Sequence, residues 1–254
     1  MIRKLLRKFR DKFFGNIYVK LRNINTELGN INTKLDELLR ITNNSQNELS
    51  LLCDLYGSDK GTFCGRNAHT YTSVYEYLFS DIRSEVKLVF ECGIGTNNPD
   101  IASNMGIGGH PGASLRVWRD YFPNALILGA DIDKEILFSE DRIETGYIDQ
   151  TSPETIIGYF NMLDEKYRNN FDIMIDDGLH SFDAAKCLFE NSFSQLKTNG
   201  LYIIEDMHDN EILEFGDYFK LHFADNEVIV NNMLMPVGQA HRRDNNLIII
   251  RKLV

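Results

Sequence analysis

The chain has 254 residues, of which 43% are hydrophobic, and this is enough for one α/β domain with a large core plus an appendage. The formal net charge is −10 at pH 7, but it is unevenly distributed. Residues 1–20 hold seven Lys or Arg and one Asp, a net charge of +6, which leaves −16 for the remainder. An acidic body of this kind argues against nucleic acid as the main partner.

Cysteine usage and hydropathy both favour a cytoplasmic protein. No two cysteines form a C-x-x-C pair, so reduced thiols are expected and a zinc site is not. No apolar run approaches the roughly 18 residues of a transmembrane helix. The basic N-terminus also lacks the continuous apolar segment of a signal peptide.

Residues 1–50 are expected to form a separate N-terminal extension. Within residues 14–40, apolar residues alternate spacings of three and four, which is the heptad seam of a short coiled coil; they include Leu21, Ile24, Leu28, Ile31, Leu35 and Leu38. This pattern favours a homo-oligomer assembled through the N-terminal helix. The alternative is one amphipathic helix that lies along the rest of its own chain.

The first 13 residues carry a second pattern. Arg and Lys alternate there with apolar residues that share one helical face, namely Ile2, Leu5, Leu6, Phe9 and Phe13. A basic amphipathic helix can lie on an anionic membrane surface, so peripheral contact with the inner face of a membrane is one interpretation. The helix could equally dock a membrane-bound protein or continue the oligomer. Residues 42–46 have the composition of a linker.

Residues 51–254 begin a pattern of buried strands that end in polar or glycine-rich turns. Residues 86–90 form an apolar run that ends in Glu91, Gly93 and Gly95, and residues 125–130 form a second run that ends in Asp131. Open α/β sheets hold an adenosine-containing cofactor in this way, with glycines that let the backbone approach the ligand and an acid that holds ribose hydroxyls. Asp133 is the rival to Asp131 for the ribose.

The spacing of the glycines decides between cofactors. A dinucleotide-binding site has the motif G-x-G-x-x-G/A, but Asn98 stands at the position of the third glycine. This makes a nicotinamide or flavin cofactor a weaker interpretation. No Gly-Lys-Ser/Thr follows, so a P-loop is excluded. The remaining pattern, E-x-G-x-G, resembles motif I of class I S-adenosylmethionine-dependent methyltransferases. An ordinary strand-to-helix turn is the alternative.

Further apolar runs follow at residues 143–148, 171–175, 200–204 and 246–251, with an amphipathic segment at 183–196. Strands that alternate with helices predict a parallel sheet covered on both faces. We therefore expect a Rossmann-like class I methyltransferase fold, with a mostly parallel seven-stranded sheet, over residues 51–254. Polar residues follow these runs, where ligands bind in such sheets, namely Asp149, Gln150, Asp176, Asp177, His180, Glu205 and Asp206.

Several motifs together resemble the macrocin- and mycinamicin-type sugar O-methyltransferases. They are residues 57–62 (Gly-Ser-Asp-Lys-Gly-Thr), 69–72, 75–76, 111–125, 176–180 and 204–207, and the resemblance covers about residues 53–254. Bacterial polysaccharide-locus methyltransferases are similar in carrying an extended segment like residues 96–110. The resemblance implies a sugar or cell-surface glycan precursor as the acceptor. With such an acceptor, a membrane-bound glycosyltransferase is one partner that the basic helix of residues 1–13 could dock. The Gly, Asn and Pro content of residues 97–110 predicts an ordered functional loop.

The chemistry of methyl transfer suggests roles for the strand-end residues. Asp177, Glu205 and Asp206 follow strands that should be neighbours, and three converging carboxylates repel one another unless a cation neutralises them. Oxygen ligands suit Mg²⁺, and the resemblance implies the same three residues as its ligands. The alternative is a set of solvated acids. The resemblance also implies that His180 is the general base, against a histidine that only packs near a helix N-terminus.

The remaining candidates concern the cofactor and the acceptor. We expect Glu91, Gly93 and Gly95 to line the methionine and ribose region, and Asp149 and Gln150 to contact adenine. If strand alternation persists, Asp176 points away from Asp177 and is structural or contacts the amino acid end of the cofactor. Three aromatic residues either close over donor or acceptor or pack as a cap on the sheet, namely His69, Tyr71 and Tyr75.

Three other functions stay open at this point. The acceptor could be a catechol-like molecule or a phosphorus-bound oxygen in place of a sugar. The chain could be a non-catalytic scaffold whose coiled coil assembles partners, although a scaffold has no need for the full set of site residues. A nicotinamide enzyme fits least well, because of Asn98.

Overall fold

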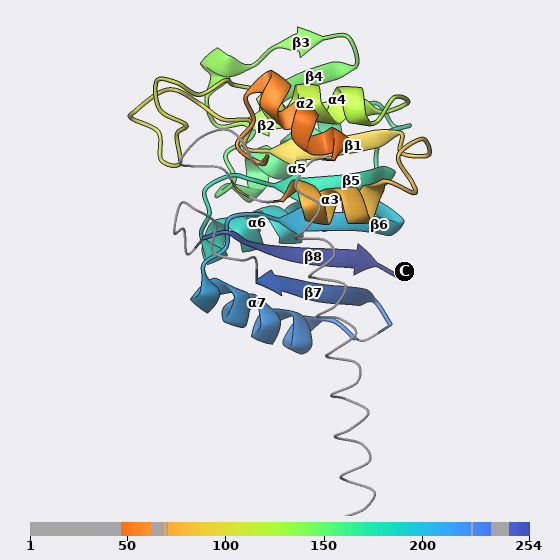
Figure 1. Cartoon of the computed structure of the whole chain (residues 1–254). Coiled ribbons are helices and arrows are strands. Elements are labelled where there is room, and N and C mark those ends of the chain that lie inside the picture. Colours follow the sequence, from red (N-terminus) through yellow and green to blue (C-terminus); the bar gives the residue numbers. More distant parts are fainter. Residues whose placement is uncertain (1–46, 62–68, 70, 225, 235–243) are drawn as a thin grey trace, which may run out of the picture. The chain divides into compact units, whose positions relative to one another are not determined.

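The structure is a computed structural model, and it describes residues 47–61, 69, 71–224, 226–234 and 244–254 (Figure 1). The chain divides into two units, Met1–Ser45 and Gln46–Val254, and all described residues belong to the second. The predicted coiled coil, basic helix and linker lie outside the described residues. Within the described part of the chain, no helix combines the length and the apolar character needed to cross a membrane.

One mixed sheet forms the centre of the described domain, in the strand order β3-β4-β2-β1-β5-β6-β8-β7 (Figure 1). The strands are β1 (Leu88–Cys92), β2 (Leu126–Asp131), β3 (Ser139–Glu140), β4 (Ile143–Tyr147), β5 (Phe171–Asp176), β6 (Leu196–Ile204), β7 (Val228–Leu234) and β8 (Asn246–Lys252). Strands β4, β2, β1, β5 and β6 run parallel, whereas β8 is antiparallel to both of its neighbours. The α/β prediction is confirmed.

The sheet differs from the prediction in two strands. It has eight strands where seven were expected, because two residues at 139–140 pair antiparallel with β4 in a short hairpin. The apolar runs located six strands, so the position of strand β7 was not predicted. Its centre carries Asn231 and Asn232, so it lacks the continuous apolar run that marks the inner strands.

Helices cover both faces of the sheet. They are α2 (Glu48–Tyr56), α3 (Thr72–Phe79), α4 (Ala113–Tyr121), α5 (Pro153–Met162), α6 (Phe182–Ser192) and α7 (Asp209–His222). Two short 3₁₀ turns are η2 (Lys134–Ile136) and η3 (Phe193–Gln195). The alternation of β1 explains how the helices divide. Phe90 packs on Phe160 of α5 with ring centroids 5.0 Å apart, while the next residue, Glu91, accepts a hydrogen bond from Trp118 of α4. Figure 1 shows α2, α3 and α4 together on one side of the strands.

Helix ends agree with local sequence signals. Asn47 caps α2 in a reciprocal capping box with Ser50, and Gly57 ends this helix in the left-handed conformation with φ 75°. Helix α6 is shorter than the amphipathic segment 183–196 suggested. It ends at Ser192, η3 follows, and Leu196 already begins β6.

The ladder of the parallel strands continues into the turns that follow them. The Asp177 amide donates to the Cys92 carbonyl at 2.8 Å, and the Glu205 amide donates to the Asp176 carbonyl at 2.9 Å. The carboxyl ends of β1, β5 and β6 therefore meet at one edge, which is where ligands bind in such sheets.

Candidate active site

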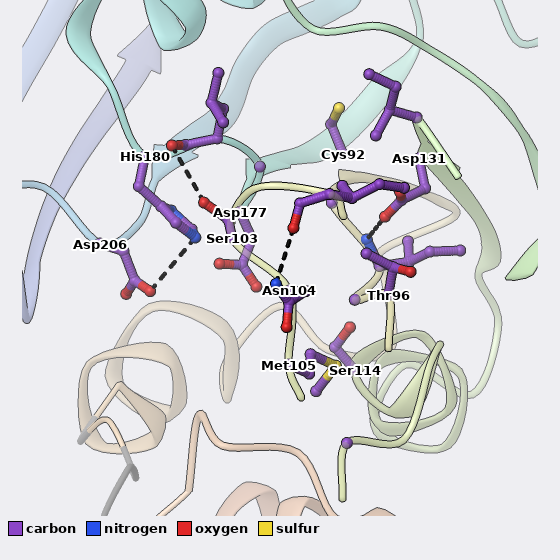
Figure 2. A pocket seen from close by; sticks show the side chains of 18 of the residues that line it. Cys92, Thr96, Ser103, Asn104, Met105, Ser114, Asp131, Asp177, His180 and Asp206 are labelled. Atoms are coloured by element: carbon purple, nitrogen blue, oxygen red, sulfur yellow. Dashed lines mark hydrogen bonds and ion pairs between the residues drawn. The ribbon is translucent and has the colours of Figure 1, made fainter. Parts of the chain in front are cut away.

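A cavity of about 860 Å³ opens at this edge, and Figure 2 shows part of its lining. The glycine turn after β1 forms one wall. Gly93 has φ 86°, and a Cβ atom there would collide with the backbone carbonyl of Asp177. Gly95 has φ 83°, and a Cβ atom there would collide with Met105. Both positions therefore require glycine, because the backbone is left-handed and the neighbouring atoms are in contact with it.

Asp131 faces this cavity from the end of β2. Its carboxylate accepts hydrogen bonds from the amides of Ile94 and Asp133, both at 2.9 Å. Burial raises the pKa of Asp131, and the backbone amides that donate to it oppose the rise. Asp133 does not line the cavity, because its carboxylate accepts from the Thr96 hydroxyl at 2.5 Å. Of the two rivals for the ribose, Asp131 lines the cavity and Asp133 does not.

Asp149 and Gln150 also line the cavity, whereas two residues expected among the cofactor contacts do not. Asp176 is buried and accepts from the Gln150 side chain at 2.6 Å, so it shapes the wall through its neighbour. Burial raises the pKa of Asp176 to about 7. Glu91 is fully buried, since alternation along β1 turns it toward Trp118 at 2.8 Å and away from the glycine turn.

A buried lysine joins the carboxylates on the other wall. The Lys60 ammonium lies 2.5 Å from Asp177 Oδ2, 2.5 Å from Glu205 Oε2 and 3.4 Å from Glu91 Oε1. Burial alone would lower the pKa of Lys60, but the three carboxylates outweigh it and raise the pKa well above the usual value. No role was assigned to this residue from the sequence. The only signal was its place in the Gly-Ser-Asp-Lys-Gly-Thr segment, which says nothing about partners more than 100 positions away.

The three aromatic candidates hold these acids in place and do not line the cavity. The Tyr75 hydroxyl donates to Glu205, and the Tyr71 hydroxyl donates to Asp206 at 2.5 Å. His69 Nδ1 lies 3.3 Å from Asp206 and stacks on Tyr71 with ring centroids 4.9 Å apart. All three side chains are buried, so the interpretation as an aromatic cap fits their positions better than direct contact with a ligand.

His180 and Asp206 meet in strained backbone conformations. Both have positive φ, 54° and 56°, and His180 Nε2 lies 3.8 Å from Asp206 Oδ2 (Figure 2). Non-glycine residues pay a conformational cost in this region, and such residues concentrate at functional sites. Side chains of Asp177, His180 and Asp206 point toward one another, and one potential ligand atom from each lies within 4.8 Å of the others.

The donor set fits a divalent cation. Burial raises the pKa of Asp206 against the opposing effect of His69, and burial also raises the pKa of Glu205 against the opposing effect of Lys60. A bound cation would stabilise both carboxylates in their charged form, and oxygen donors suit Mg²⁺. One predicted ligand is placed differently from the expectation. Glu205 is held by Lys60 and Tyr75, so it is not in the cluster that Asp177, His180 and Asp206 form.

The long segment after the glycine turn is an irregular loop, as predicted, and no helix forms between residues 97 and 112. The Met105 amide donates to the Thr96 carbonyl at 2.8 Å, and the Ser103 hydroxyl donates to the Leu179 carbonyl at 3.3 Å. Ser103, Asn104 and Met105 line the cavity (Figure 2). The loop therefore spans the cavity from the glycine turn to the segment that carries His180.

Comparisons with known proteins agree with this geometry. No protein-family model matches the chain. A tetracenomycin-C rhamnosyl 3'-O-methyltransferase of Streptomyces olivaceus is 32% identical over 174 residues, which are 68% of this chain and 40% of that protein. Demethylmacrocin O-methyltransferase of Streptomyces fradiae is 35% identical over 55% of this chain and 32% of its own length.

Among solved structures, MycE methyltransferase from the mycinamycin biosynthetic pathway, in complex with Mg and SAH, matches with a TM-score of 0.61 and 26% identity. The match covers 82% of this chain and 56% of MycE. The described domain has the class I methyltransferase fold. Its curated homologues are sugar O-methyltransferases of the macrocin and mycinamicin type, as the motifs predicted. The chain spans less than half the length of the curated relatives that it matches.

Proposed function

We propose that the chain is an S-adenosylmethionine-dependent, Mg²⁺-assisted O-methyltransferase that acts on a hydroxyl of a sugar or of a cell-surface glycan precursor. One observation carries this proposal: Asp177, His180 and Asp206 converge on the same cavity that the Gly93 turn and Asp131 line. A methyl donor and an acceptor hydroxyl could therefore meet there. The sugar methyltransferases among the relatives support the choice of acceptor class.

The cofactor would lie along the glycine turn. Asp131 would accept hydrogen bonds from ribose hydroxyls, and Asp149 and Gln150 would contact the adenine. S-adenosylmethionine supplies a methyl group on a positively charged sulfur. Gly93 and Gly95 add no side chain to this turn, and the Met105 side chain of the long loop packs against Gly95.

Asp177 and Asp206 would hold the cation, which would lower the pKa of a bound hydroxyl. His180 would then accept the hydroxyl proton at Nε2, the ring nitrogen that faces the cluster. The imidazolium that forms would be stabilised by Asp206, whose Oδ2 lies 3.8 Å away. Tyr71 and His69 would keep Asp206 oriented, since both contact its Oδ1.

The test is a methyl-transfer assay with radiolabelled S-adenosylmethionine and a panel of sugars, nucleotide sugars, catechols and phosphorylated acceptors. We expect label on a sugar or a glycan precursor, loss of label in EDTA, and recovery with Mg²⁺. Transfer to catechols alone would replace the acceptor class but keep the chemistry. Undiminished transfer in EDTA would contradict the metal role.

We propose in addition that residues 1–50 assemble the enzyme into a homo-oligomer, with residues 14–40 as the contact. Heptad spacing in the sequence supports this. Light scattering of the full chain, compared with a Leu28→Lys, Leu35→Lys variant, is the test. A mass that falls to that of the 29.3 kDa monomer in the variant is expected. A wild-type monomer would contradict the proposal.

A further inference from the structure

The carboxylates beside the cavity are short of positive charge. Four of them, Glu91, Asp177, Glu205 and Asp206, lie at the ends of β1, β5 and β6. Among the described residues that contact them, Lys60 is the one lysine or arginine. Asp206 accepts a hydrogen bond from the neutral Tyr71 hydroxyl, and His69 and His180 lie beside it. Burying this much unbalanced charge is costly, because charges lose their hydration in the interior.

Lys60 is placed to reduce that cost. Its residue is 2% exposed, and its ammonium has three protons to donate. The ammonium donates hydrogen bonds to Asp177 Oδ2 and Glu205 Oε2, at 2.5 Å each. Glu91 Oε1 lies 3.4 Å from the ammonium and accepts no hydrogen bond from another group. Lys60, which lies between α2 and α3, thus contacts residues at the carboxyl ends of three strands.

The same contacts set Lys60 against a metal ion. An oxygen of Asp177 that donates electron density to Mg²⁺ cannot also accept a full hydrogen bond from the ammonium along the same lone pair. A second positive charge beside a bound cation also repels it, and this repulsion is strong at short distance in a buried site. Lys60 and a divalent cation therefore compete for Asp177, the one residue that Lys60 contacts within the cluster of Asp177, His180 and Asp206.

We propose that Lys60 is a positioning residue that acts as the resident counter-ion of this cluster. It holds Asp177 and Glu205 in place when no metal is bound, and it weakens the binding of the divalent cation that the proposed function requires. This inference rests on that function, because it takes the carboxylate cluster as the metal site.

The test compares Lys60→Met, which removes the charge, with Lys60→Arg, which keeps it. Lys197→Met is the matched control, since Lys197 pairs with Asp172 at the opposite end of β5. Mn²⁺ binding to each full-length protein is measured by electron paramagnetic resonance without cofactor, and thermal unfolding is measured in EDTA and in Mg²⁺.

We expect Lys60→Met to unfold at a lower temperature in EDTA, yet to bind Mn²⁺ about tenfold more tightly than the wild type. Its unfolding temperature should also rise more on addition of Mg²⁺. Lys60→Arg and Lys197→Met should bind Mn²⁺ as the wild type does. A residue with a merely structural role would lose metal affinity when replaced, so equal or weaker Mn²⁺ binding by folded Lys60→Met overturns the proposal.

If Lys60→Met does not fold in EDTA, it should fold in saturating Mg²⁺, because the cation replaces the missing charge. If Lys60→Met does not fold in Mg²⁺ either, Mn²⁺ binding is measured for the double variant Lys60→Met, Glu205→Gln and compared with that of Glu205→Gln alone. Tighter Mn²⁺ binding by the double variant supports the proposal, and equal binding or failure to fold contradicts it. These readouts need no methyl transfer, so the proposed function can fail in its own assay while this inference stands.

Discussion

The two walls of the cavity are built in different ways. The cofactor wall consists mainly of backbone, with Gly93 and Gly95 in left-handed conformations and Asp131 fixed by two amides. The acidic wall consists of largely buried charges, and their partners include Lys60, Tyr71 and Tyr75, which lie far away in the sequence. The first wall depends on local geometry, whereas the second depends on electrostatic balance. Substitutions should therefore damage them in different ways, through shape on one side and through charge on the other.

The largest effect is expected at the cofactor wall. Gly93→Ala would force a left-handed backbone and a collision with the Asp177 carbonyl, so it should destabilise the fold by about 3 kcal/mol or more and abolish S-adenosylmethionine binding. Thermal unfolding and calorimetry measure both. The control is Gly158→Ala in α5, where an added Cβ meets nothing within 4 Å and helix propensity should rise. A Gly93→Ala protein with normal stability would show that shape does not govern this wall.

At the acidic wall, His180→Ala should leave the fold and S-adenosylmethionine binding intact but reduce turnover by roughly 10² to 10⁴, which is the usual contribution of a general base. His222→Ala is the control, since this exposed histidine contacts the Tyr218 carbonyl in α7. The assay is label transfer at saturating cofactor. Retained turnover in His180→Ala would remove this residue as the base.

Asp177→Asn keeps the shape of the side chain and removes its charge. We expect it to lose metal-stimulated activity while S-adenosylmethionine still binds, because the amide is a poor ligand for Mg²⁺. Activity measured against Mg²⁺ concentration gives the result, with exposed Asp164→Asn as control. An unchanged Mg²⁺ response in Asp177→Asn would mean that the cation binds elsewhere.

The smallest effect is expected at Asp176, which does not line the cavity but accepts a hydrogen bond from Gln150, a residue that does. The pKa of Asp176 is raised by burial from 3.8 to about 7, so between these values the folded state keeps a proton that the unfolded chain has lost. The free energy of unfolding therefore falls as pH rises from about 4 to about 7. Asp176→Asn should remove this loss and gain about 1–3 kcal/mol at pH 8 relative to pH 5. Urea unfolding at both pH values, beside exposed Asp217→Asn, should reveal the gain, and an unchanged pH dependence would contradict it.

Much of the cofactor wall could be predicted from the sequence because its determinants are local. The apolar runs before Gly93 and Asp131 mark buried parallel strands, and their order predicts that their ends meet. The same patterns misplace Glu91, because the alternation that turns it toward Trp118 depends on where β1 begins and ends.

The acidic wall was predicted only in part. Asp177, His180 and Asp206 follow strand ends and were found together, but the partners of Glu205 could not be predicted. Lys60 and Tyr75 reach it through the packing of α3 and the preceding turn on the sheet, and no periodicity in the sequence encodes that contact. Strand β7 was missed for a simpler reason, since the adjacent Asn231 and Asn232 interrupt its apolar run.

The most direct test of the proposed activity is a calorimetric titration of the full chain with S-adenosylmethionine, with and without Mg²⁺, and with NAD as the control ligand. Specific binding of S-adenosylmethionine, together with no heat from NAD, is the predicted result. A folded protein that binds no S-adenosylmethionine in either condition would contradict the methyltransferase function and favour a scaffold.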